Sequence, residues 1–229
     1  MRTHPFTGEA REALALPWRE KGLPGREGDA RLFASRAIDA IWRAPSWWPY
    51  VVALPAAVAL GIASELVEGS GSTLARLGLA LGGALGWTLF EHALHRFVFH
   101  APLRSEAGRA VLLIVHGHHH VWPRDRSRLT ATPWQAALTW LLAYGAFRAL
   151  LAPPHALAAT AGFGLGYVAY EAMHFLAHHG RPRARWLRAI RAHHLRHHHV
   201  DPTSRWGISS PLWDVILGTR PRDRRPITG

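Results

Sequence analysis

Four long apolar stretches constrain the fold of this chain more than any other feature of its sequence. They cover residues 47–67, 74–90, 134–151 and 156–173, and each holds one formally charged residue. A helix of about 20 mostly apolar residues spans a bilayer, with a usual range of about 17–25, so all four qualify or nearly so. The buried helices of a soluble bundle would normally keep a polar face, which these stretches lack. The sequence therefore favours four membrane spans.

Glycines recur at helical spacing within two of these stretches. Gly78, Gly82 and Gly86 are four residues apart in the second, as are Gly162 and Gly166 in the fourth. Small residues on one helix face let two helices approach closely in lipid. The spacing predicts that these glycines lie where helices pack.

The basic residues give the four spans an orientation. Of the 27 Lys and Arg, eight precede residue 47, six lie between 96 and 128, and eleven lie between 181 and 225. The short links over 68–73 and 152–155 hold no basic residue apart from the histidine at 155. Since basic loops stay on the cytoplasmic side, both termini and the central loop are predicted to be cytosolic. This placement and anionic lipid headgroups explain the net charge of +12, and no nucleic-acid partner is needed.

The pattern predicts an all-α integral membrane protein in which two helical hairpins form a four-helix stalk. A cytosolic helical cap is expected from residues 91–133 and 174–229, on a membrane domain of residues 46–229. Residues 1–45 are expected to form a cytosolic or interfacial segment. Within it, residues 32–42 have the apolar spacing of a helix that either lies on the membrane or is solvated. The short basic start is not followed by an apolar run, so no secretory signal is expected.

Histidines are concentrated at the predicted cytosolic side. Four clusters, over residues 92–100, 116–120, 174–179 and 193–199, hold all but two of the 17. Each cluster lies at, or next to, the cytoplasmic end of an apolar stretch. The chain has no Cys, so any metal site must use His, Asp or Glu. Loose metal stores tend to be tandem and disordered, so dispersed clusters with distinct spacings predict a built metal site.

The spacing selects the ligands. His174 and His178 are four apart on one helix face and can share a metal. The pattern HxxHH occurs twice, starting at positions 116 and 194, and presents three rings to one side of a helix. His95 and His100 lie about 140° apart around a helix of about 3.6 residues per turn, so they either bind different metals or lie where the helix frays. Ten ligands suit two metals, and the predicted set is His95, His100, His116, His119, His120, His174, His178, His194, His197 and His198.

The other clustered histidines are left out of this ligand set. His92 is expected to pair with Glu91 and to tune the site. His118 and the isolated His155 are expected to tolerate alanine. Three more flank the motifs and are expected to orient ligands or to face solvent: His179, His193 and His199.

The segments EHALHRFVFH, HGHHHVWPRD, YEAMHFLAHH, HHLRHHH and SRWGISSPLWDVILGT carry a family resemblance. Between about Trp87 and Thr219 the chain resembles the fatty acid hydroxylase/sterol desaturase superfamily, the integral-membrane histidine-box diiron enzymes, and is most similar to the fatty acid 2-hydroxylase branch. By this resemblance the family's ligands fall on the same ten histidines. In the tail, Ser210 is expected to cap a helix that starts at Pro211, with Trp213 packed under the site.

The resemblance implies an O₂-dependent diiron hydroxylase of a membrane lipid, with a fatty acyl chain as the expected substrate. Breaking an unactivated C–H bond needs an oxidant stronger than any side chain, which iron and O₂ supply. The same imidazoles bind zinc, so a purified sample could carry Zn²⁺ instead. Alternatives are a sterol or carotenoid hydroxylase or a lipid desaturase with the same site, and a membrane metal-binding or transport protein. No ionisable residue lies near the centre of a span, which disfavours transport.

The electron donor is expected to be a separate protein. Some eukaryotic members of the superfamily carry a fused cytochrome b5 domain with a His-Pro-Gly-Gly motif, but here His4-Pro5 continues with Phe6-Thr7. A ferredoxin- or cytochrome-type reductant is therefore expected. Arg205 and Trp206 stand where lighter residues are usual in the family, which leaves the shape of the substrate open.

Overall fold

The computed structural model describes residues 4–29, 31–69 and 71–221, so the two ends of the expected cytosolic regions, 1–3 and 222–229, lie outside the described residues. All the named secondary-structure elements in this part of the chain are helices. One isolated antiparallel bridge joins Phe6 and Phe33. The all-α prediction is confirmed. The α-helices are α1 (Gly8–Leu14), α2 (Arg36–Ile41), α3 (Leu54–Leu66), α4 (Thr73–Ala93), α5 (Glu106–Leu112), α6 (His118–Val121), α7 (Pro133–Leu150), α8 (Pro153–His179), α9 (Arg185–His199) and α10 (Leu212–Ile216), and the π-helical turns are η1 (Pro49–Ala53), η2 (Leu94–Phe99) and η3 (Leu113–Gly117).

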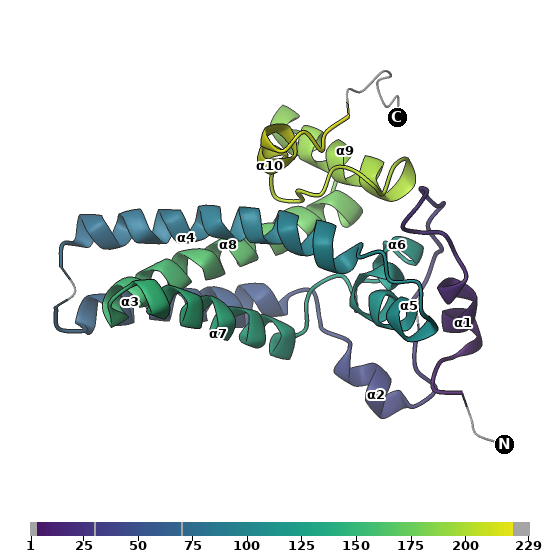
Figure 1. The fold of residues 1–229 in the computed structure, drawn as a ribbon, viewed down its shortest axis with the longest axis horizontal. Coiled ribbons are helices and arrows are strands. Elements are labelled where there is room, and N and C mark those ends of the chain that lie inside the picture. Colours follow the sequence, from purple (N-terminus) through teal and green to yellow (C-terminus); the bar gives the residue numbers. More distant parts are fainter. Residues whose placement is uncertain (1–3, 30, 70, 222–229) are drawn as a thin grey trace.

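Four long helices, α3, α4, α7 and α8, run side by side along the long axis of the molecule (Figure 1). The shorter helices gather at one end, and the links α3–α4 and α7–α8 lie at the other (Figure 1). A Cβ atom added to Gly71 in the first link would lie 3.4 Å from Nε2 of His155 in α8, next to the second link. Helix α8 is central, because it packs against α3, α4 and α7. This arrangement leaves all the clustered histidines at the end opposite to the links.

The outward surfaces of the long helices are apolar. Large aliphatic side chains are exposed along α3, α4 and α7, among them Ile62, Leu81 and Leu141. By length and composition, two helical segments of the described chain could cross a membrane, Pro49–Leu66 and Thr73–Phe99. Neither α7 nor α8 is among them. Helix α8 is largely covered by its neighbours, so its composition need not be as apolar as that of a helix facing lipid.

Helices α4 and α8 do pack through glycines, but α4 uses a different face from the predicted one. A Cβ atom added to Gly162 would lie 1.8 Å from a carbonyl oxygen of α4, and one added to Gly83 would lie 2.0 Å from a carbonyl oxygen of α8. The prediction was wrong for the second apolar stretch, whose regularly spaced glycines have no neighbouring atom within 4 Å of an added Cβ: Gly78, Gly82 and Gly86. The reason is that the buried face of α4 is set by larger anchors, among them Trp87 and Glu91.

Residues before α3 pack against the histidine-bearing end of the molecule. Trp18, Leu32 and Phe33 share a hydrophobic cluster with Leu113 and Trp122. The helix expected within residues 32–42 is present as α2. Its Asp39 side chain accepts hydrogen bonds from the backbone N–H groups of residues 32 and 33 and pairs with the guanidinium of residue 128 at 2.5 Å. The segment is thereby fixed to the central loop.

We expect Gly162→Val to lower the melting temperature of the detergent-solubilised protein markedly, because overpacking at a helix contact typically costs about 1–3 kcal/mol. Gly82→Val is the matched control, since it makes the same change of helix propensity where an added Cβ meets nothing. Thermal unfolding followed by circular dichroism compares the two. Equal melting temperatures for both variants would contradict the close approach of α4 and α8.

Candidate metal centre

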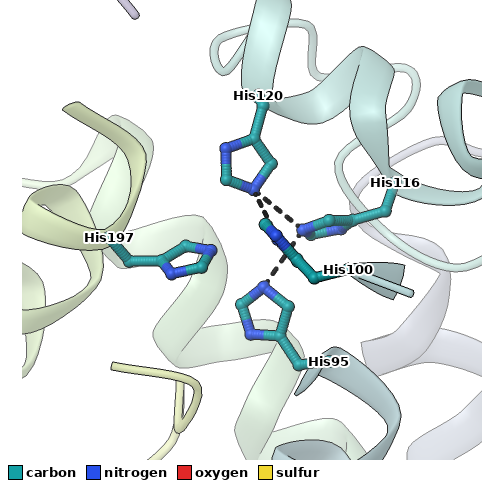
Figure 2. A group of neighbouring side chains, drawn as sticks. All are labelled: His95, His100, His116, His120 and His197. Carbon is teal, nitrogen blue, oxygen red and sulfur yellow. Dashed lines mark hydrogen bonds between the residues drawn. The ribbon is translucent and has the colours of Figure 1, made fainter. Parts of the chain in front are cut away.

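The ten histidines chosen by spacing come together in two groups of five. Within each group, one ring nitrogen per residue lies within 4.8 Å of those of the other four. Figure 2 shows the first group, in which the rings of η2, η3, α6 and α9 turn toward a common centre. Helices α6, α8 and α9 supply the second. The first group is His95, His100, His116, His120 and His197, and the second is His119, His174, His178, His194 and His198.

A π-helical turn brings His95 and His100 to the same group. The α-helix ends at Ala93, and η2 follows it directly. The N–H of His100 donates to the carbonyl of His95 at 3.1 Å, five residues back. In a π turn, residues five apart lie nearly above one another, and such turns often occur at functional sites. The structure thus places His95 and His100 in one group, at a point where the α-helix gives way to a π turn rather than fraying.

Each HxxHH motif contributes to both groups rather than to one. His116 and His120 point into the first group, while His119, between them on α6, points into the second. On α9 the split is reversed, with His197 in the first group and the other two motif histidines in the second. The two groups consequently touch: the rings of residues 120 and 198 stack with centroids 4.2 Å apart. Helices α6 and α9 thus form a wall shared by the two groups.

The ring nitrogens fit metal ions. Two nitrogens bound to one ion at about 2.1 Å lie roughly 3 Å apart. The Nε2 atoms of both His197 and His198 are buried with no hydrogen-bond partner, a costly state unless an ion binds them. Five Nε2–Nε2 pairs lie 2.7–3.2 Å apart: His95–His116, His116–His120, His100–His120, His119–His174 and His178–His194.

Burial keeps these rings in the form that binds metal. The exposed fractions of His194 and His197 are both 0%. Burial, and then the neighbouring rings, hold the pKa of His119 well below its usual value, and burial lowers the pKa of His174 to about 3. The rings are therefore neutral at physiological pH, and the neutral imidazole is the metal ligand.

Backbone carbonyls of the tail orient two of the rings. His95 donates from Nδ1 to the carbonyl of Trp206 at 2.7 Å, and His197 donates from Nδ1 to the carbonyl of Ser204 at 2.7 Å. These bonds fix the tautomer and leave each Nε2 free to face the group. Arg205, between the two carbonyls, has a φ of 62°. A non-glycine residue in this left-handed region costs about 1–2 kcal/mol, so the surrounding contacts must hold the turn.

Asp214 holds this tail in place and was not found by the sequence analysis. Its buried carboxylate accepts the backbone N–H groups of Trp206 and Gly207 at 2.9 and 2.8 Å, and the hydroxyl of Thr219 at 2.6 Å. His193, predicted only to flank a motif, lies 3.0 Å from it through Nε2. Although burial raises the pKa of Asp214, these hydrogen bonds hold it well below its usual range. An acidic residue inside the otherwise apolar run LWDVI was the available signal.

One smaller expectation for the histidines was wrong, and the structure argues against a second. His92 faces Asp214 at 3.4 Å rather than Glu91, whose carboxylate instead accepts the backbone N–H groups of residues 208 and 209. His118 is buried, and its two ring nitrogens lie 3.1 and 2.9 Å from the carbonyls of Leu113 and Arg128. The neutral ring can donate to one of these carbonyls, and alanine would remove that donor and leave a cavity, so we no longer expect alanine to be tolerated.

The expected cap of the tail helix was wrong, because Pro211 is the N-cap residue of α10 and no side chain caps the helix from this position. Ser210 Oγ accepts the N–H of Leu212 at 3.1 Å, but α10 begins at Leu212 and Pro211 precedes it. The indole N–H of Trp213 donates to the hydroxyl of Thr88 at 2.9 Å, which fastens α10 to α4.

An apolar cavity of about 290 Å³ lies beside the first group. His95 lines it together with side chains from α4, α7 and α8, including Trp87, Trp140 and Tyr167. Trp134, at the start of α7, lines the cavity and is exposed, so the cavity opens along the outer surface of the long helices. One end of an apolar cavity therefore meets a candidate metal centre.

Comparisons with known proteins agree with this arrangement. The family model described as fatty acid hydroxylase matches residues 80–219. The dihydroceramide fatty acyl 2-hydroxylase FAH1 of Arabidopsis thaliana is 33% identical over 181 residues, which cover 79% of this chain and 76% of that protein. The fatty acid 2-hydroxylase of Homo sapiens is 37% identical over 147 residues, covering 62% of this chain and 39% of the human protein.

A solved structure shows the same fold. The hydroxylase domain of full-length scs7p superimposes with a TM-score of 0.79 at 30% identity, over 88% of this chain and 76% of that one. The named relatives are hydroxylases and therefore oxidoreductases, which confirms the prediction of an enzyme. The chain belongs to the fatty acid hydroxylase family.

Proposed function

We propose that this protein is an O₂-dependent diiron hydroxylase that acts on a fatty acyl chain of a membrane lipid. The observation that carries the proposal is the position of His95, which belongs to the first histidine group and also lines the apolar cavity. A chain in this cavity would present its carbon atoms to the metal centre. The relatives act on fatty acyl chains according to their names, which supports this substrate class.

The two histidine groups would each hold one iron ion through five imidazoles. Bound iron supplies, with O₂, an oxidant strong enough to attack an aliphatic C–H bond. Because zinc binds the same ligands, Zn²⁺ could replace iron in purified protein. The full ligand set of the proposal is His95, His100, His116, His120 and His197 for one ion, and His119, His174, His178, His194 and His198 for the other.

The protein's own side chains would bind and orient the substrate. Trp87 and Tyr167 are buried cavity walls in mutual contact, with ring centroids 5.2 Å apart, so an acyl chain would pack on rigid aromatic surfaces. Phe99 also lines the cavity, and its ring stacks on that of His116 with centroids 4.8 Å apart. These apolar walls would keep water from the reacting carbon.

The proposed protein is a multi-pass membrane enzyme with its site at the cytoplasmic surface. Exposed aliphatic side chains along α3, α4 and α7 support contact with lipid. Most basic residues belong to the segments that carry or adjoin the histidine groups, away from the links α3–α4 and α7–α8, which supports a cytoplasmic position for the site. In this proposal the membrane domain spans residues 46–229 and crosses the bilayer four times. Hydroxylation with O₂ also needs two electrons, which a separate ferredoxin- or cytochrome-type protein would deliver from the cytosol.

Four crossings with cytosolic termini predict the location of reporter proteins fused along the chain. Fusions at Gly71 and Pro153, in the two links, should read as external, because these links carry almost no basic residues. Fusions at Arg126 and after the C-terminus should read as cytosolic. A cytosolic reading at Gly71 would rule out the first hairpin.

Two metal ions per chain are expected by elemental analysis of purified protein. His119→Ala and His197→Ala should each lower the content toward one, because each removes a ligand from a different group. His155→Ala, at the far end of α8, is the control and should keep two. A content of about one ion that neither ligand substitution changes would contradict a dinuclear centre.

Reconstituted, iron-loaded enzyme with an electron donor should introduce one ¹⁸O atom from ¹⁸O₂ into an acyl chain. His174→Ala should abolish turnover, because it removes a buried ring of the second group, whereas His155→Ala should retain it. Mass spectrometry of the lipid products measures both effects. If the modified lipid carried no ¹⁸O, desaturation would explain the reaction better than hydroxylation.

A further inference from the structure

A short segment of the N-terminal region crosses the first histidine group. We define the strap as residues 18–26, which lie between α1 and α2. Trp18 is buried, and its ring centroid lies 5.2 Å from that of His120 and 5.3 Å from that of His100. The centroid of its ring also lies 6.3 Å from that of His116. All of the histidine ring contacts recorded for Trp18 are with the first group.

The chain makes room for this indole. A Cβ atom added to Gly117 would lie 2.5 Å from Cζ2 of Trp18, so the backbone beside His116 and His118 touches the ring directly. Any larger residue at position 117 would displace the indole from η3. The contact is therefore part of how the first group is built and not an incidental surface packing.

The rest of the strap ties the ligand segments together. The Arg19 guanidinium donates to the carbonyls of Ala101 and Leu103 at 2.5 and 3.2 Å, directly after His100. The N–H of Arg26 donates to the carbonyl of Val121, directly after His120, at 2.7 Å.

The strap also holds the end of α9. The N–H of Leu23 donates to the carbonyl of His198 at 3.3 Å, and His199 Nδ1 donates back to the carbonyl of Leu23 at 2.8 Å. A Cβ atom added to Gly22 would lie 2.1 Å from the carbonyl carbon of His199, so the two backbones are in direct contact. The strap thus contacts the chain directly after His100, directly after His120 and at the end of α9, three places where histidines of the two groups lie.

We propose that the strap closes the first group and that Trp18 is a positioning residue that retains the ion bound there. The inference rests on the proposed assignment of one ion to each group. An aromatic wall against three ligand rings limits their motion and excludes water, and loss of supporting contacts around metal ligands typically weakens metal binding about 10–100-fold. The second group has no such wall from Trp18. The strap lies outside residues 80–219, which the family model matches.

The test measures zinc release from the full-length, Zn²⁺-loaded protein in detergent after addition of a chromogenic chelator. We expect Trp18→Ala to release one equivalent about tenfold faster while the other keeps the wild-type rate. Trp18→Phe should restore most of the slow release, because it keeps an aromatic ring on the group. Trp186→Ala is the matched control, since Trp186 is 59% exposed on α9 and has no recorded ring contact with either group.

Selectivity separates a positioning role from a structural one. If Trp18→Ala releases both equivalents faster by the same factor, together with a lower melting temperature, or changes neither rate, the inference is overturned while the two-metal site stands. A wild-type content below two equivalents overturns the metal assignment and the role of Trp18 with it. Faster release of one equivalent alone, with an unchanged melting temperature, supports the inference.

Discussion

Ten imidazole rings packed into two groups are the constraint on which this structure depends, and eight of them have an Nε2 atom that faces another ring's Nε2 at 2.7–3.2 Å. Each facing pair of neutral rings can share at most one proton, and a buried nitrogen without a partner costs several kcal/mol. Ions bound at the two groups, as proposed, would remove this cost. The other contacts at this end, from the tail and from the strap, hold rings that would otherwise separate.

The sequence was sufficient for the composition of the groups but not for their geometry. Histidine spacing is a local property, so all ten members could be found from it. Their division between two groups depends on π turns such as the one after Ala93, which no spacing rule encodes. Likewise, apolar stretches predicted the long helices, yet only the tertiary structure shows that α4 packs through Gly83 rather than through its regularly spaced glycines. The role of Asp214 could not be predicted from the sequence, because this residue binds backbone N–H groups of a loop without regular structure.

The site is distributed over nearly the whole chain. The π turn η2 after α4 supplies His95, the end of α8 supplies His174, and α9 supplies rings to both groups. The segment around residue 22 and the tail held by residue 214 of α10 then support these rings from two sides. Since a ligand group must keep its geometry to within a fraction of an ångström, residues outside the ligand set are as necessary as the ligands themselves.

The tail links the metal centre to the cavity. The carbonyl of Trp206 orients His95, while two residues later the N–H of Ile208 binds the carboxylate of Glu91, and both Ile208 and Glu91 line the cavity. A shift of this loop would therefore rotate a ligand and reshape the cavity wall at the same time. The left-handed turn at Arg205 sets the loop's path, so in the proposed enzyme the Arg-Trp pair would act on the substrate only through Ile208 and His95, which line the cavity. In the proposed enzyme, metal geometry and substrate position would consequently both depend on the tail and would not vary independently.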